Sequence, residues 1–363
     1  MREHSAAAGA RSLLHGAARH LGTLDPVSQL GDVLDESLSR PAGDDAYRGH
    51  HTLEPLFSES AAGSLAFDLL PGGPWASPSD RVAMATDTAR RLTERNFGRR
   101  ARQWLDGHID VASSLGGRSS TWGAALRSGF GRDGALESAL HMEWGPQLMD
   151  ALPAPLHRVV RIVHATAPGL APAICTVSTT PRGGSQQVTF AVPRALPLAR
   201  LQPLMKRLGL GHQHASLVSA VALLLGARYV LPPDTATVTV GVNRAGARLR
   251  LDVHLDAIPD PPPEITRLLR LQMSERPSSL RAFQAWVAAL TPEGYDGPGR
   301  LSVLSVIVRP DRPARLALHL SPAVLERPRR RRRRPIRDEE DDVWTVPRDE
   351  VPASAWLPAG ASP

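Results

Sequence analysis

The sequence predicts an α+β fold in which about ten antiparallel strands form a barrel with helices on its outside. Hairpin patterns begin at residues 173, 235 and 300, so successive starts lie 62 and 65 residues apart. Helical patterns separate these hairpins, and each hairpin has one apolar and one polar face. A helix–strand–strand–helix unit that recurs at a nearly fixed period is typical of an array or a closed ring.

The three clear hairpins each consist of two alternating segments around turn residues. Segment 173–192 turns at a Pro/Gly stretch, 235–258 turns at Asn243–Gly246, and 300–322 turns at Pro310–Pro313. Glycine, proline and asparagine between alternating runs are the usual signals of a hairpin turn.

Two earlier units complete the predicted ring. Residues 121–144 predict a fourth hairpin that turns at Arg132–Gly134, followed by a helix over 146–166. Residues 63–73 predict one strand of a fifth unit, ahead of a helix over 78–97. Five such units supply up to ten strands, which is the basis of the predicted barrel.

The polar faces decide between two architectures. Pairing Asn243 with Arg248 places Thr239 opposite Asp252 and leaves the leucines on the other face. An open antiparallel sheet would turn this polar face to solvent. We favour a closed barrel, because the repeat is even and the polar residues include many small Thr and Ser side chains that line a lumen without filling it.

The closed barrel gives a definite expectation for four side chains. Thr239, Arg250, His254 and His319 all lie on polar faces, so we expect them to point into the lumen.

The chain divides into three parts by composition. Residues 1–45 predict an N-terminal helical extension with helices over 6–21 and 27–38, and 46–326 form the barrel domain. Residues 327–363 contain a run of arginines, a run of acidic residues and several prolines. Blocks of like charge with little apolar content predict a disordered tail.

The composition narrows the function. Lys206 is the only lysine, and this bias toward arginine, with abundant Ala, Gly and Pro, is typical of a high-GC bacterial genome. Cys175 is the only cysteine, so one chain can build no disulfide and no cysteine-based zinc site. The longest apolar run, near 217–226, is too short to span a bilayer. We expect a soluble cytoplasmic protein with no membrane partner.

Three short segments resemble the ABBA aromatic prenyltransferases, whose ten-stranded barrel is called the ABBA or PT barrel. "LHMEWGP" at 140–146 is similar to a lumen strand of that family, and "RLALHLSP" at 315–322 is similar to its last strand. "SLAFDLLPGG" resembles an early strand whose acidic residue is a base in indole-specific members, and Asp68 falls there. The resemblance covers about 60 to 325.

The resemblance implies a reaction and roles for particular residues. A prenyl diphosphate would ionise in the lumen, and its allylic cation would alkylate an electron-rich aromatic ring, most plausibly an indole in a small molecule or peptide. Arg248, Arg250 and Arg315 would bind the diphosphate, since planar guanidinium groups bind phosphate oxygens in pairs. Asp68 or Glu143 would accept the ring proton.

The chain departs from the family in its lumen residues. The family lines its lumen with tyrosines and lysines, whereas the three tyrosines of this chain lie outside the predicted strands. His141, His254 and His319 stand at the matching places, and we include them among the candidate substrate-binding residues. We expect no metal site and no required cofactor, and the sequence leaves a magnesium requirement open.

Two other functions remain open. The same barrel, without catalysis, could bind a hydrophobic ligand or assist a natural-product biosynthetic enzyme of secondary metabolism. Alternatively, the arginine run Arg329–Arg334 could bind nucleic acid through phosphates. The adjacent acidic run nearly cancels that charge, and aromatic residues are only 4% of the chain, so stacking on bases is disfavoured.

Overall fold

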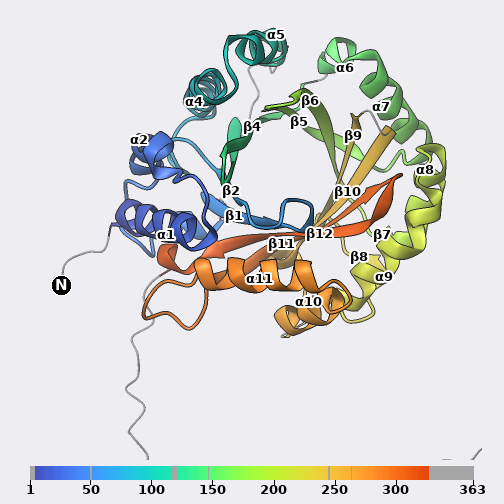
Figure 1. The fold of residues 1–363 in the computed structure, drawn as a ribbon. Helices are drawn as coiled ribbons and strands as arrows, with labels where there is room; N and C mark the ends of the chain where they lie inside the picture. The colour runs from blue at the N-terminus through green and yellow to red at the C-terminus, as the bar shows by residue number, and fades with distance from the viewer. Residues whose placement is uncertain are drawn as a thin grey trace, which may run out of the picture. The chain divides into compact units, whose positions relative to one another are not determined.

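The strands form a closed antiparallel barrel. The computed structural model describes residues 5–49, 51–115, 121–145, 147–243, 246–262 and 264–326. Viewed along the barrel, the strands surround a central region and the helices lie outside them (Figure 1). The barrel strands are β1 Leu53–Ser58, β2 Leu65–Leu69, β3 Ala124–Gly131, β4 Gly134–Glu143, β5 Ala171–Thr180, β6 Gly183–Ala191, β9 Ala236–Asn243, β10 Gly246–His254, β11 Gly299–Arg309 and β12 Arg312–Pro322.

Closure follows from five hairpins joined side by side. The order around the ring is β1-β12-β11-β10-β9-β6-β5-β4-β3-β2, and β2 pairs with β1 to close it. Every neighbouring pair is antiparallel, and because the ring is closed it contains no edge strand. The short strands β7 (Leu196–Pro197) and β8 (Val230–Leu231) form a separate two-stranded sheet. The predicted closed barrel is therefore confirmed.

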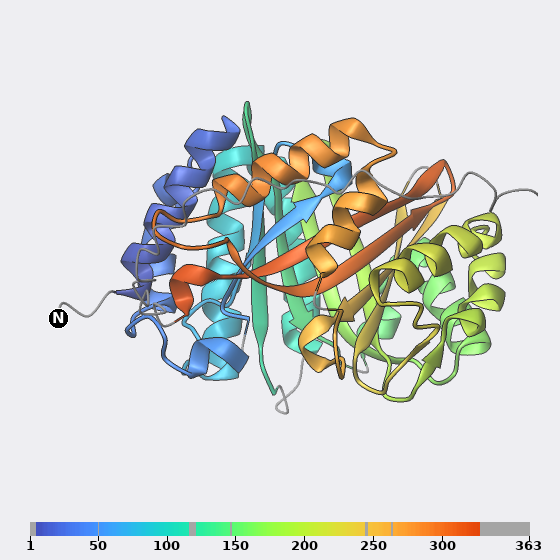
Figure 2. The same cartoon turned by 90° about the horizontal axis from the view of Figure 1, so that it is seen from below.

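Helices cover the outside of the barrel, as the side view also shows (Figure 2). They are α1 Ala6–Leu21, α2 Val27–Ser37, α3 Ala46–Gly49, α4 Pro78–Phe97, α5 Arg99–Leu115, α6 Leu148–Ala151, α7 Ala154–Thr166, α8 Leu201–Arg207, α9 His214–Leu224, α10 Ile265–Met273 and α11 Pro277–Ala289. The predicted helix over 78–97 is α4. Within the described ranges, no helix combines the length and apolar character needed to cross a bilayer.

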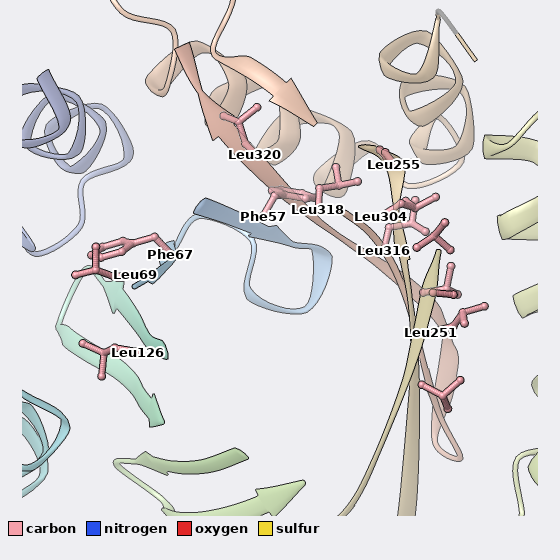
Figure 3. Close-up of a cluster of buried hydrophobic side chains, with 14 of the residues drawn as sticks. Phe57, Phe67, Leu69, Leu126, Leu251, Leu255, Leu304, Leu316, Leu318 and Leu320 are labelled. Carbon is pink, nitrogen blue, oxygen red and sulfur yellow. The ribbon is translucent and has the colours of Figure 1, made fainter. Parts of the chain in front are cut away.

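The hydrophobic core lies between the strands and the helices. Leu251, Leu316 and Leu318 extend from the strands toward the helix layer (Figure 3), and all three are at most 2% exposed. Phe67 and Phe130 stack on neighbouring strands with ring centroids 6.1 Å apart. Since side chains alternate along a strand, the residues between these apolar positions face the inside of the barrel.

The register of the β9–β10 hairpin corrects the prediction by two residues. Asn243 pairs with Gly246, which places Thr239 opposite Arg250 and not opposite Asp252. Gly246, the first residue of β10, has a φ of 117°, a backbone conformation that glycine adopts without strain. A shift of two residues keeps every side chain on its predicted face.

Two further segments differ from the sequence prediction. β1 is the partner of β2 and was not predicted, because Pro55 interrupts its alternating pattern. The helix predicted over 146–166 is instead α6 and α7, which are separated at Leu152 and Pro153. A proline disfavours the helical conformation of the residue before it, so the chain leaves the helix there.

The N-terminal helices share the hydrophobic core of the barrel. α1 and α2 form where the sequence predicts them, and Leu14, Leu30 and Leu34 are fully buried. Gly43 donates its backbone N–H to the Leu325 carbonyl, which joins this region to the end of the barrel domain. The proposed tail, residues 327–363, lies outside the described residues.

Candidate functional site

The inner face of the barrel carries charged and polar side chains. Arg250 lies opposite Thr239 on β9 and Ile307 on β11, while its chain neighbours Leu249 and Leu251 are buried in the outer layer. His254 and His319 occupy the same inward positions of β10 and β12, opposite Val303 of β11. The register thus places Thr239, Arg250, His254 and His319 inside, as predicted from the alternating pattern.

A row of alternating imidazoles and carboxylates crosses several strands of the inner face. We call it the carboxylate–imidazole belt, formed by His51, Glu54, His319, Asp68 and His141. His51 Nδ1 lies 2.6 Å from Glu54 Oε1. His319 Nδ1 lies 3.6 Å from Glu54 Oε2 and 3.5 Å from Asp68 Oδ2, and His141 Nε2 lies 3.7 Å from Asp68 Oδ1. Closure of the barrel brings these residues together.

Asp68 is held by a guanidinium group. Arg127 donates Nε and Nη2 to the two carboxylate oxygens of Asp68, both at 2.7 Å. Burial acts to raise the pKa of Asp68, but the Arg127 charge and the adjacent His141 outweigh it and keep the pKa well below its usual range. The same ion pair raises the pKa of Arg127 against the effect of its own burial. Asp68 is therefore an ionised anchor within the belt.

Among the described residues, the nearest partners of the Glu54 carboxylate are imidazoles and not guanidinium groups. Its side chain is only 7% exposed, and burial acts to raise its pKa. The neighbouring His319 and His51 overcome this effect and hold the pKa of Glu54 below its usual range. His51 is 44% exposed, so the belt reaches from the interior of the barrel to solvent at this residue.

Two belt histidines have a ring nitrogen without a hydrogen bond. His141 Nδ1 contacts Thr176 Oγ1 at 2.8 Å, which leaves Nε2 facing Asp68. Among the described residues, buried His141 Nε2 and His319 Nδ1 find no hydrogen-bond partner. Burial lowers the pKa of His141, so its neutral form is favoured. A bound ligand could satisfy these inward nitrogens.

A second ion pair lies on β10. Arg250 Nε donates to Asp252 Oδ2 at 2.9 Å, and Ser305 donates to Asp252 Oδ1 at 2.5 Å. Burial opposes ionisation of Asp252, but Arg250 and Ser305 keep its pKa below the usual value. Burial also lowers the pKa of nearby His254, despite the opposing charge of Asp252.

The inner faces of β10, β11 and β12 carry a patch of arginines. We call this set, Arg248, Arg250, Arg309 and Arg315, the inner arginine patch. Arg250 and Arg315 lie opposite Ile307 from its two sides. Within the described part of the chain, the Arg248 and Arg315 side chains form no ion pair. Burial lowers the pKa of Arg248 to about 10; Glu137 opposes this shift and Arg250 adds to it.

Glu143 lies on the inward side of β4, but its carboxylate is hydrogen-bonded to the segment that precedes β3. Its carboxylate accepts hydrogen bonds from Thr121 N at 2.7 Å, Thr121 Oγ1 at 2.8 Å and Trp122 N at 3.2 Å. These bonds fix the segment that leads into β3. Glu143 thus does not join the belt formed around Asp68.

Sequence reasoning assigned no role to His51, Glu54, Arg127 or Arg309, although the alternating pattern placed Arg309 on the polar face of its hairpin. Glu54 was missed because its strand was not predicted, although the two residues that flank the Glu-Pro pair, Leu53 and Leu56, indicate a short strand. Arg127 lies in the predicted hairpin 121–144, on the polar face opposite Ala139. Its bond to Asp68 joins two hairpins that the sequence alone does not align.

The described residues contain no group of three or more His, Cys, Asp or Glu side chains placed to hold a metal ion. Two hollows of about 500 and 410 Å³ lie outside the barrel, beside Trp75 and beside Arg194. Neither is lined by residues of the belt or the inner arginine patch.

Comparison with known proteins finds similarity at the level of structure. No protein-family model matches the chain, and no curated protein sequence matches it. A 6-dimethylallyltryptophan synthase from Micromonospora olivasterospora, solved with DMASPP and Trp, is 13% identical with a TM-score of 0.69, over 89% of this chain and 98% of that one. The 5-dimethylallyltryptophan synthase from Streptomyces coelicolor is 14% identical with a TM-score of 0.63, over 89% and 99%.

A third solved structure, the prenyltransferase PriB, is 13% identical with a TM-score of 0.64, over 88% of this chain and 97% of that one. PriB was also solved as a binary complex with product diphosphate. These matches span nearly the whole of each relative. The chain therefore has the barrel fold of the ABBA-type prenyltransferases that its sequence resembles.

Proposed function

We propose that this chain is an aromatic prenyltransferase that moves a prenyl group from an allylic diphosphate to an aromatic ring, with indoles as the favoured acceptors. The observation that carries the proposal is the convergence of the inner arginine patch and the carboxylate–imidazole belt inside one closed barrel. Cations that bind an anionic leaving group and carboxylates that accept a proton are the two charge types this reaction needs.

The patch is suited to a diphosphate. Strands in a sheet lie about 4.8 Å apart, so β10 to β12 span roughly 10 Å, which matches the reach of guanidinium groups around two linked phosphates. Arg248 and Arg315 are available, and Arg250 is oriented by Asp252. Their charges would stabilise the diphosphate as the bond between the allylic carbon and oxygen breaks.

The belt is suited to remove the proton. After the new carbon–carbon bond forms, the ring loses a proton and its aromaticity returns. Asp68 is occupied by Arg127, and Glu143 is occupied by Thr121 and Trp122. Among the described residues, the Glu54 carboxylate is hydrogen-bonded to His51 and lies 3.6 Å from His319, with no guanidinium partner. We therefore assign Glu54 the role of proton acceptor, with Asp68 beside His319 and His141.

The test is direct product analysis. The full chain is incubated with dimethylallyl or geranyl diphosphate and a panel of indoles, phenols and Trp- or Tyr-containing peptides, and adducts are sought by mass spectrometry. We expect adducts with indoles. Binding of inorganic diphosphate is measured by calorimetry in the same preparation.

The matched variants are Arg248→Ala with Arg315→Ala, and Arg207→Ala. The double variant removes two charged donors, each worth about 1.5–3 kcal/mol per hydrogen bond, so diphosphate binding should fall by more than a hundredfold. Arg207 is exposed on α8 and serves as the control. Absence of both adducts and diphosphate binding in the unmodified protein would contradict the proposal, and the barrel would then be a non-catalytic binding protein.

A further inference from the structure

Among the described strand residues, the inner face of the barrel carries no phenylalanine, tyrosine or tryptophan, and its only aromatic rings are imidazoles. Among the described strands, phenylalanine is the only one of these three residue types, and its four positions are Phe57, Phe67, Phe130 and Phe190. All four are at most 3% exposed and belong to the hydrophobic core outside the barrel. Inward positions of these strands instead carry Thr, Ser, Gln, Gly, Ala, charged residues and histidine, together with a few aliphatic side chains such as Ile174, Val303 and Ile307.

Water has access to this inner face. The side chains of Asp68 and Arg127 are 17% and 11% exposed, and that of Arg250 is 22% exposed, although all three point into the barrel. The hydroxyl groups of Thr189 and Thr239 lie 2.8 Å apart beside the inner arginine patch, although the two residues are only 6% and 3% exposed. Partly exposed charged side chains therefore lie beside the proposed diphosphate site, together with the aliphatic side chain of Ile307.

We propose that the barrel also hydrolyses the prenyl diphosphate when no acceptor is bound. This inference rests on the proposed function, because the same arginines must first promote ionisation of the donor. The allylic carbon–oxygen bond breaks, and the diphosphate leaves with the electron pair. A water molecule then forms the new bond to the allylic cation, and its proton passes to the diphosphate. The products are a prenyl alcohol and diphosphate.

The physical reason is the missing protection of the cation. An aromatic face attracts a cation through its quadrupole and also displaces water from it. In this barrel an aromatic acceptor would supply that face itself, so transfer would dominate only when the acceptor is present. Without it, the nucleophiles near the cation are water and polar side chains.

The experiment follows oxygen from the solvent. The full chain is incubated with dimethylallyl diphosphate and no acceptor in water enriched in ¹⁸O, and the alcohol and the phosphates are analysed by mass spectrometry. We expect the label in the alcohol, because water attacks carbon, and none in the diphosphate. Label in phosphate would show cleavage of a phosphorus–oxygen bond by another route and would overturn the inference.

A matched pair of variants tests the cause. Ile307 lies on the inner face between Arg250 and Arg315. Ile307→Phe places a ring beside the proposed cation, and Ile307→Leu changes shape without adding a ring. With limiting indole, we expect the alcohol-to-adduct ratio to fall about tenfold in the Phe variant, corresponding to about 1.4 kcal/mol, and to stay unchanged in the Leu variant.

The outcomes separate this inference from the proposed function. Adducts with indole but no alcohol in the absence of acceptor would overturn hydrolysis and leave transfer standing. Labelled alcohol with no adduct from any acceptor would support hydrolysis and overturn transfer. If neither product forms, both proposals fail. An equal change of the ratio in both Ile307 variants would show that the ring is not the cause, and would overturn the explanation.

Discussion

The outer and inner faces of the same ten strands follow different physical rules. On the outer face, Leu251, Leu318 and Phe67 pack against helices and lose nearly all contact with water. On the inner face, Arg127, Asp68 and Arg250 keep part of their exposure and are matched by specific charges. The outer layer contributes stability through apolar area, whereas the inner layer sets which ligand chemistry the barrel can perform.

Because the two faces differ in this way, we expect substitutions on the outer face to change mainly stability and substitutions on the inner face to change mainly ligand binding. Apolar packing is distributed over many residues, so one truncation weakens the fold but leaves the charges of the interior in place. Charge pairs are local, so removal of one partner changes the field at the site directly. Four predictions test this division.

The largest effect on stability is expected on the outer face. Phe67→Ala removes a fully buried ring that stacks on Phe130 and should reduce the free energy of unfolding by about 3–5 kcal/mol. Urea unfolding measures the loss, and Phe67→Leu is the milder control. Diphosphate binding of the folded variant should stay near that of the unmodified protein. A small loss of stability with a large loss of binding would reverse the assignment of the two faces.

The next effect concerns the inner ion pair. Arg127→Met leaves the Asp68 carboxylate buried without its guanidinium partner and should destabilise the protein by about 3 kcal/mol. The double variant with Asp68→Asn removes both charges and should recover most of that loss. Thermal unfolding of the single and double variants checks this. If both are equally unstable, the pair acts through packing and not through charge.

The third prediction is the dependence of stability on pH. The folded-state pKa of Glu54 lies below its unfolded value, so its contribution is fully present above about pH 4.3 and is lost as pH falls through the folded-state pKa. Each unit of pKa difference corresponds to about 1.36 kcal/mol. Glu54→Gln should therefore flatten the acid side of the stability profile, measured by urea unfolding at several pH values. An unchanged acid slope would contradict the role of its imidazole partners.

The smallest effect compares the same chemical pair on each face. Thr93 and Thr179 are fully buried and share a hydrogen bond of 2.8 Å in the outer layer, while Thr189 and Thr239, which are 6% and 3% exposed, share one of 2.8 Å on the inner face. Thr179→Val leaves Thr93 without its partner away from water and should cost about 1–2 kcal/mol.

Thr239→Val should cost less than about 1 kcal/mol, because Thr189 on the inner face keeps 6% exposure, so that water can replace the lost hydroxyl group. Both variants are measured by the same urea unfolding assay. Equal losses would indicate that the inner face is as dry as the outer layer, and this would also weaken the argument for hydrolysis of the donor.

The sequence by itself determined the alternation of the strands and hence the two faces. Arg250 and His254 follow a strict two-residue period with Leu249 and Leu251, and this local pattern is enough to predict that the first two point inward. The repeat of the hairpins was also readable from the chain, so closure could be favoured. The face on which each side chain lies is predicted correctly even when the predicted register is wrong by two residues, as in the β9–β10 hairpin.

Only the tertiary structure decided which charges meet. Asp68 is bonded to Arg127 and lies next to His319, which belongs to the last strand of the barrel. Glu54 belongs to the site because it lies on β1, a strand that the alternating pattern does not predict, since Pro55 interrupts that pattern. These contacts depend on how the ring closes and on the stagger between hairpins. The stagger is the shift in register from one hairpin to the next. It depends on packing over the whole barrel, so no local sequence pattern predicts it.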